Sequence, residues 1–246
     1  MLAIIGGSGL TQLASLEVGR RKASRTPHGE PSGPLTFGRI GKTDVVFLAR
    51  HGYGHTIAPH EVNYRANLWA LKQAGADSVV SVASVGGIRN DIWPGTLVLP
   101  HQIIDYTWGR AATFFEGPAA PVNHIDFTQP YSRALRERIL KAALACGERL
   151  TDGGVYAATQ GPRLETAAEI DRLERDGADL VGMTGMPEAP LAREIGLAYA
   201  AIAVVANYAA GRGDSERAVP LDKIQAVLDE GMRRVRHIIE RFCEQR

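Results

Sequence analysis

Two apolar runs in the N-terminal part of the chain are each followed by residues that could bind an anion. Leu2–Ile5 leads into the turn Gly6–Gly9, whose glycines let backbone N–H groups approach an anion closely and whose Ser8 adds a hydroxyl donor. A second run ends at Arg50 and His51, and the arginine carries a planar fork of donors that matches phosphate. These residue types predict an oxyanion site formed by Ser8, Arg50 and His51.

Each motif taken alone also has a purely structural interpretation. The glycine turn matches neither the dinucleotide fingerprint, which needs glycine where Gln12 stands, nor the hydrolase elbow, which needs glycine where Leu10 stands. Such a turn is more often structural than ligand-binding. From the pair alone, Arg50 and His51 are equally compatible with a surface arginine beside a hydrogen-bonded loop histidine.

Small, polar or sulfur-containing residues also follow three further predicted strands. In open α/β sheets, ligands bind at the carboxyl ends of strands. Hydroxyl, thioether and amide groups that meet there suit a small, polar, partly aromatic ligand, so the repetition favours a binding site over separate structural turns. The strands Val79–Val82, Asp179–Gly182 and Leu197–Ala206 are followed, respectively, by Ala83 and Ser84, by Met183 and Thr184, and by Asn207.

The apolar patterns of the remaining chain predict an α/β protein. No internal repeat or linker is seen, so residues 1–246 are predicted to form one domain. The long aromatic loop Tyr106–Pro121 is expected to be functional or interfacial. Predicted helices span Val62–Ala74, Tyr131–Cys146, Glu165–Arg175, Pro187–Glu194 and Asp222–Phe242, and further strands span Leu35–Ile40, Asp44–Ala49, Thr96–Pro100, Gln102–Ile104 and Gly154–Ala158.

Composition excludes several classes of function. The net charge is +1 and no basic run occurs, so nucleic acid is not expected as a partner. No apolar run approaches the ~20 residues needed to span a bilayer, and Met1–Leu10 lacks the features of a signal peptide. The distant Cys146 and Cys243 form no disulfide framework, which suits the cytoplasm, and His55 and His60 lack the spacing of a metal site.

The sequence resembles the trimeric purine nucleoside and methylthioadenosine phosphorylases over nearly its whole length. The similarity is carried by IIGGSGL, by LARHGYGHTIAPHEVNYRANLWALK and by VGMTGMPEAPLAREIGLAYAAIAVVANY. It implies a single-domain αβα sandwich around a mixed, twisted sheet, assembled as a homotrimer with sites at subunit interfaces. It also implies phosphorolysis of a purine nucleoside, with inorganic phosphate as co-substrate and with neither a metal nor a cofactor.

The resemblance assigns roles to individual residues. His51 and Asn207 are expected to be catalytic, and His55 matches a family loop histidine near the sugar. Ala83 stands where the methylthioadenosine enzymes usually carry threonine, so one hydroxyl contact is either missing or supplied by Ser84. The phosphate-binding positions are Ser8, Arg50, His51, Ala83, Ser84 and Thr184, and the substrate-binding positions are Met183, Asn207, Tyr208, Ala209, Glu165, Leu221 and His124, the last reaching a neighbouring subunit.

The expected base is a 6-oxopurine. Asn207-Tyr208-Ala209 stands where methylthioadenosine phosphorylases carry Asp-Tyr-Asp, and an amide can donate to a 6-oxo group. Glu165 matches a glutamate of the inosine and guanosine phosphorylases, where a carboxylate accepts a hydrogen bond from purine N1–H. The competing interpretation of Glu165 is a first-turn acid that is favoured by the helix dipole.

The sugar end points to a thioether. The inosine enzymes place a histidine near the last helix to bind the 5'-hydroxyl, whereas this chain has Ala218, Val219, Leu221 and Ile224 there. An apolar wall favours a 5'-methylthio group, since a hydroxyl would be left unpaired. The expected reaction is therefore phosphorolysis of S-methyl-5'-thioinosine. The alternatives are methylthioadenosine phosphorylase, inosine or guanosine phosphorylase, and a purine-binding sensor without turnover.

Overall fold

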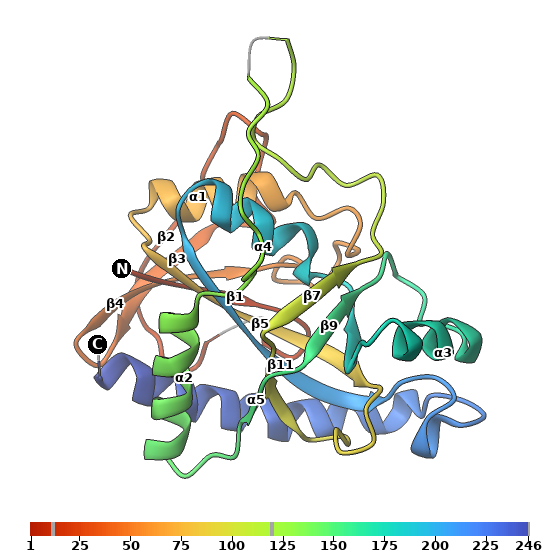
Figure 1. Cartoon of the computed structure of the whole chain (residues 1–246). Coiled ribbons are helices and arrows are strands. Elements are labelled where there is room, and N and C mark those ends of the chain that lie inside the picture. Colours follow the sequence, from red (N-terminus) through yellow and green to blue (C-terminus); the bar gives the residue numbers. More distant parts are fainter. Residues whose placement is uncertain (11–12, 119–120, 246) are drawn as a thin grey trace.

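A mixed β-sheet flanked by helices on both faces forms the centre of the computed structural model, which describes residues 1–10, 13–118 and 121–245 (Figure 1). The strands are β1 Leu2–Gly6, β2 Glu17–Lys22, β3 Leu35–Ile40, β4 Thr43–Ala49, β5 Ser78–Gly87, β6 Leu97–Leu99, β7 Gln102–Asp105, β8 Thr151–Asp152, β9 Val155–Ala158, β10 Leu180–Gly182 and β11 Ala198–Tyr208. The helices are α1 Tyr64–Gln73, α2 Arg133–Ala145, α3 Ala167–Arg175, α4 Gly185–Glu194 and α5 Leu221–Glu244, with a short 3-10 turn at Gly213–Ser215.

The sheet is mixed and branched at β5. Its main path runs β2-β3-β4-β1-β5-β10-β9-β7, while β11 pairs with β5 and β6, and β8 pairs with β6. Strand β1 pairs in parallel with β4 and with β5, and β5 also pairs in parallel with β11. Strand β10 runs antiparallel to β5. The carboxyl ends of β1, β4 and β11 therefore lie at one edge of the sheet, beside the last residues of β5.

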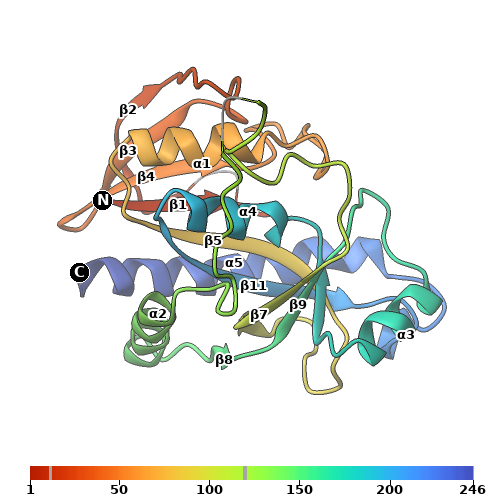
Figure 2. The same cartoon turned by 45° about the horizontal axis from the view of Figure 1, so that its top comes forward.

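Side-chain alternation along the central strands fills two separate cores. Leu2 and Ile4 of β1 belong to the core that contains α2 and α5, whereas Ala3 and Ile5 belong to the core that contains α1 and α4. Figures 1 and 2 show the same two layers, with α1 and α4 on one side of the sheet and α2 and α5 on the other. The predicted αβα sandwich around a mixed sheet is confirmed.

The strand predicted at Val79–Val82 is longer than expected. Ala83 and Ser84 were expected to follow it, but residues 83–87 belong to β5, which continues to Gly87 and pairs with both β10 and β11. Their small size serves close packing, because a Cβ on Gly87 would lie 2.2 Å from the Ile92 carbonyl oxygen. A long buried strand and a turn both favour small residues here, so composition alone did not separate them.

Glu165 does not begin a helix as predicted. Helix α3 starts at Ala167 after the cap residue Thr166, whose side chain forms a capping box with Glu169. Glu165 therefore lies outside the first turn, and its interpretation as a first-turn acid is wrong. Strand β2 was not predicted, because all six of its residues are exposed and they carry no apolar alternation. Within the described residues, no helix is long and apolar enough to cross a membrane.

Candidate active site

A cavity of about 470 Å³ lies where the strand ends meet. Ten of the predicted site residues line it: Ser8, Arg50, His51, Ala83, Ser84, Glu165, Met183, Thr184, Asn207 and Ala209. They come from the turn after β1, the residues after β4, the second half of β5, the end of β10, the segment before α3 and the end of β11. Segments distant in sequence thus form one site of a size that fits a small ligand.

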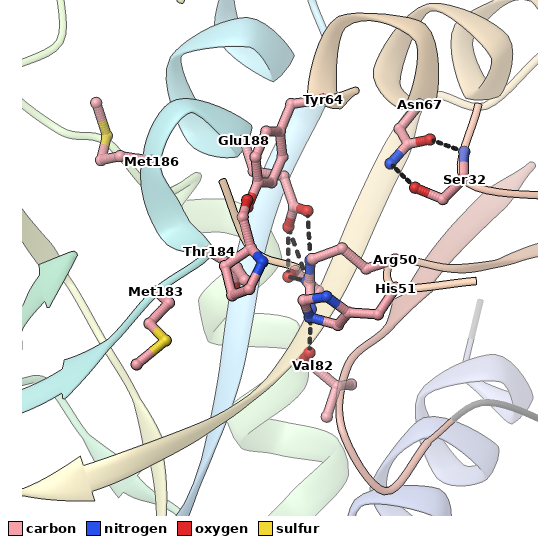
Figure 3. A network of polar contacts seen from close by, with 12 residues as sticks. Ser32, Arg50, His51, Tyr64, Asn67, Val82, Met183, Thr184, Met186 and Glu188 are labelled. Atoms are coloured by element: carbon pink, nitrogen blue, oxygen red, sulfur yellow. Dashed lines mark hydrogen bonds and ion pairs between the residues drawn. The ribbon is translucent and has the colours of Figure 1, made fainter. Parts of the chain in front are cut away.

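Arg50 forms a buried ion pair with Glu188 at the back of this cavity (Figure 3). The two side chains are 1% and 0% exposed, and the pair is bidentate, with Nε 2.7 Å from Oε2 and Nη2 3.0 Å from Oε1. Arg50 also donates to Ser81 Oγ at 2.6 Å and to the Val82 carbonyl at 3.0 Å. Burial alone would raise the pKa of Glu188, but the Arg50 charge holds that pKa below its usual value.

Glu188 is the organising carboxylate of the site, and the sequence analysis did not single it out. It also accepts hydrogen bonds from Ser81 Oγ and from the Tyr199 hydroxyl, both at 2.7 Å. Every neighbour donates, so the buried charge is fully satisfied. The sequence does indicate this role, because Glu188 is the only acid in the buried stretch Gly185–Ala189, and a buried acid needs a basic partner.

His51 is nearly buried and neutral. Its Nδ1 lies 2.8 Å from the Ile57 carbonyl oxygen, and since a carbonyl only accepts, Nδ1 carries the proton. Burial and the neighbouring Arg50 charge lower the pKa of His51 to about 4. Near pH 7 its Nε2 is therefore a free acceptor. The ring of His55 is 4.8 Å from that of His51, and His55 Nε2 is 3.4 Å from Ser8 Oγ.

Asn207 and Glu165 line the same cavity from different elements. A bulge between Val205 and Asn207 interrupts the register of β11 on β5, and a bulge turns the following side chain to a new direction. The Asn207 side-chain nitrogen donates to the Tyr208 carbonyl at 2.6 Å. Glu165 Oε1 accepts from Thr159 Oγ1 at 2.6 Å, which leaves Oε2 for another donor.

Three predicted substrate-binding residues lie outside the cavity in this chain. Leu221 is 67% exposed, and Val219 and Ile224 form the apolar wall instead, because α5 turns Leu221 outward at its first residue. Tyr208 packs against the 3-10 turn, where a Cβ on Gly213 would lie 2.6 Å from its ring. His124 is exposed in a segment without helix or strand.

Arg110 is a second residue that the sequence analysis missed. It lies in the predicted functional loop and donates to the carbonyls of Met183 and Met186 at 2.7 and 2.6 Å, and to that of Gln160 at 2.9 Å. It thus connects the loop to two chain segments that border the cavity. Among the residues that the structure describes, no group of three His, Cys, Asp or Glu side chains could hold a metal ion.

Replacement of Glu188 by glutamine tests the buried pair. Arg50 keeps its charge but loses its counter-charge, so we expect the free energy of unfolding to fall by about 3 kcal/mol in denaturant titrations at neutral pH. Because the folded pKa of Glu188 is lowered, the ionised group stabilises the fold above the unfolded pKa of about 4.3. The difference between wild type and variant should therefore narrow as the pH falls below that value.

The matched control is Glu230→Gln, which removes an exposed partner of Arg233 in α5. Exposed ion pairs contribute little, so this variant should unfold almost as the wild type does. Equal unfolding midpoints for Glu188→Gln and wild type would contradict the role given to the buried pair.

The chain matches the model of the Phosphorylase superfamily over residues 1–244. A probable S-methyl-5'-thioinosine phosphorylase from Pseudomonas syringae pv. tomato is 52% identical over 239 residues, which cover 97% of this chain and 96% of that protein. A 6-oxopurine nucleoside phosphorylase from Pyrococcus furiosus is 45% identical over 215 residues, covering 85% and 80%.

A solved structure agrees with these sequence matches. Methylthioadenosine phosphorylase from Schistosoma mansoni, in complex with adenine, superposes with a TM-score of 0.94 at 32% identity, covering 99% of this chain and 91% of that one. The resemblance seen in the sequence is confirmed, and the chain belongs to the phosphorylase superfamily.

Proposed function

We propose that this protein catalyses the phosphorolysis of S-methyl-5'-thioinosine to hypoxanthine and 5-methylthioribose 1-phosphate. An oxygen of inorganic phosphate forms a bond to the anomeric carbon while the bond from that carbon to purine N9 breaks. The electron pair of the broken bond leaves with the purine. The observation that carries the proposal is a single cavity that combines strand-end hydroxyls, Asn207 with Glu165, and the apolar Val219 and Ile224.

Phosphate is proposed to bind at the end of the cavity beside the ion pair. Ser8, Ser84 and Thr184 supply hydroxyl donors there, and Arg50 contributes a guanidinium that Glu188 holds in place. A Cβ on Gly7 would lie 2.8 Å from Arg50 Nη1. Only glycine therefore lets the turn after β1 lie this close to the Arg50 guanidinium. Fixed donors of this kind stabilise charge without reorganisation during the reaction.

The base is proposed to lie between Asn207 and Glu165. The free Oε2 of Glu165 can accept from N1–H of hypoxanthine, which adenine lacks, and the Asn207 amide can donate to a ring nitrogen or to the 6-oxo group. The hydrogen bond that the Asn207 amide donates strengthens as negative charge grows on the leaving purine. An unmatched base would leave a buried polar group unpaired, at about 1–3 kcal/mol per contact.

The ribose is proposed to lie on Met183, with its 5'-substituent against Val219 and Ile224. A thioether gains from burial on this wall, whereas a hydroxyl finds no partner in it. The same wall separates this function from the second candidate, a 6-oxopurine nucleoside phosphorylase, which a relative at 45% identity supports. The two functions share the base contacts and differ at the sugar.

The protein is further proposed to act in the cytoplasm as a homotrimer. His124 is exposed within the chain, so a role at the substrate requires it to reach the cavity of a neighbouring subunit. Cys146 and Cys243 lie far apart in the sequence and show no disulfide framework, which suits a reducing compartment.

Cleavage of three nucleosides with phosphate tests the proposed function. We expect hypoxanthine from S-methyl-5'-thioinosine at the highest kcat/KM, inosine to be slower because its 5'-hydroxyl is unpaired, and methylthioadenosine to be slowest. Faster release of adenine would overturn the proposed substrate, and a preference for inosine would favour the second candidate.

Asn207→Asp tests the base contact. A carboxyl group repels a 6-oxo oxygen and accepts from a 6-amino group, so the preference for methylthioinosine over methylthioadenosine should fall about tenfold or more in relative kcat/KM. Asn90→Asp, in an exposed loop outside the cavity, is the control. An unchanged ratio for Asn207→Asp would refute its role in recognition.

Glu165→Gln tests the N1–H contact. The amide keeps the shape of the side chain but removes the charge on the acceptor, so kcat/KM for methylthioinosine should fall by about tenfold. Glu169→Gln, which alters only the α3 capping box and its pairing with Arg163, is the matched control. If both variants turn over oxopurine as wild type does, Glu165 does not contact the base.

A further inference from the structure

The proposed phosphate site contains little uncompensated positive charge. Arg50 is the buried cation of the cavity, and Glu188 balances it at 2.7 Å. His51 is neutral near pH 7, since burial and Arg50 lower its pKa to about 4. The other side chains proposed at this end, Ser8, Ser84 and Thr184, carry uncharged hydroxyls. A phosphate dianion would therefore enter with its charge largely unpaired.

His55 is placed to supply the missing charge. It lines the cavity, its Nε2 lies 3.4 Å from Ser8 Oγ, and its ring is 4.8 Å from the ring of His51. The Ser8 hydroxyl and the His55 ring thus face the same volume. The Nδ1 of His51 is bonded to the Ile57 carbonyl and that side chain is buried, whereas His55 is exposed to solvent.

The backbone of His55 adopts a left-handed conformation, which is uncommon for a residue other than glycine. Its φ is +51°, and no other non-glycine residue of the described chain has a positive φ. A non-glycine residue in this region pays about 1–2 kcal/mol, and such outliers gather at functional sites. Hydrogen bonds from His55 N to the Gly52 carbonyl and from Thr56 N to the His51 carbonyl hold the turn.

The charged and titratable groups near His55 come from the end of β4, from α1 and α4, and from the segment before α3. Arg50 lies behind His51 and is paired with Glu188 of α4. Tyr64 of α1 donates its hydroxyl to the Pro59 carbonyl, and burial raises its pKa. Glu165 lines the cavity from the segment before α3, and α5 contributes the apolar Ile224. An imidazolium at His55 thus meets no other uncompensated cation among these groups.

We propose that His55 is a further phosphate-binding residue, which takes up one proton from solvent as the dianion enters and pairs with it as an imidazolium beside Ser8. This proposal rests on the proposed phosphorolysis and deepens it. In this step a proton from solvent forms an N–H bond on the His55 ring, and that bond breaks as the proton returns to solvent when the sugar phosphate leaves. Opposite charge nearby favours the protonated ring, so anion and proton bind cooperatively.

Sulfate is the sharp probe, because it is a dianion of the same shape that does not titrate near neutral pH. Isothermal titration with sulfate at about pH 8, in two buffers with different ionisation enthalpies, counts the protons taken up. We expect a net uptake of a substantial fraction of one proton per sulfate. Because sulfate stays a dianion at this pH, any proton taken up must bind to the protein. Phosphate titrates near neutral pH and could take up the proton itself.

His55→Asn assigns the proton, since asparagine tolerates the left-handed backbone and keeps the loop. We expect proton uptake to vanish and sulfate affinity at about pH 7 to fall roughly tenfold, as for loss of a charge-assisted hydrogen bond. His60→Asn is the matched control, because His60 is exposed in the same loop and does not line the cavity. It should bind sulfate with the proton uptake of the wild type.

The outcomes separate this proposal from the proposed function. Sulfate binding without proton uptake, or unchanged uptake in His55→Asn, overturns the role of His55 and leaves the phosphorolysis untouched. If neither sulfate nor phosphate binds and no nucleoside is cleaved, the proposed function fails and this proposal fails with it. Unchanged melting temperatures for both asparagine variants show that any loss is local.

Discussion

Arg50 and Glu188 come from opposite halves of the chain and meet where neither side chain reaches water. A buried charge loses its hydration, and an unpaired charge would not recover that free energy. Arg50 and Glu188 must therefore stay paired and keep their other hydrogen bonds. This requirement fixes the end of β4 against Ser81 and Val82 of β5 and against α4. The strand ends that surround the cavity are therefore held in one arrangement before any ligand arrives.

The same pairing shapes the chemistry of the cavity. A guanidinium that is already balanced by Glu188 offers oriented N–H donors without a large positive potential. Burial, together with the Arg50 charge, lowers the pKa of the neighbouring His51 and keeps it neutral. Under the proposed phosphate binding, recognition of the anion would depend on hydroxyls, backbone groups and an additional proton, and less on a permanent cation. Such a site can also release a charged product, because the attraction is not dominated by a fixed opposite charge.

Close strand packing and one irregularity position the other end of the cavity. The small residues of β5 let β10 and β11 approach it from both sides, and a Cβ on Gly86 would lie 3.2 Å from Val181 Cγ1. The bulge before Asn207 then interrupts the regular alternation of β11. Glu165 reaches the same cavity only because α3 begins after it, at a cap formed by Thr166.

The sequence by itself determined the α/β class, most strand and helix positions, the family and ten of the residues that line the cavity, because apolar periodicity and strand-end motifs are local features. The tertiary structure alone decided which charges meet: the motifs assigned no role to Glu188 or Arg110, and the partners of both are distant in sequence. It also decided that residues 83–87 stay in a strand and that Leu221 points away from the cavity, since pairing and helix rotation are set by neighbours. Local patterns name the groups that can do chemistry, whereas burial and long-range contacts set their charge and direction.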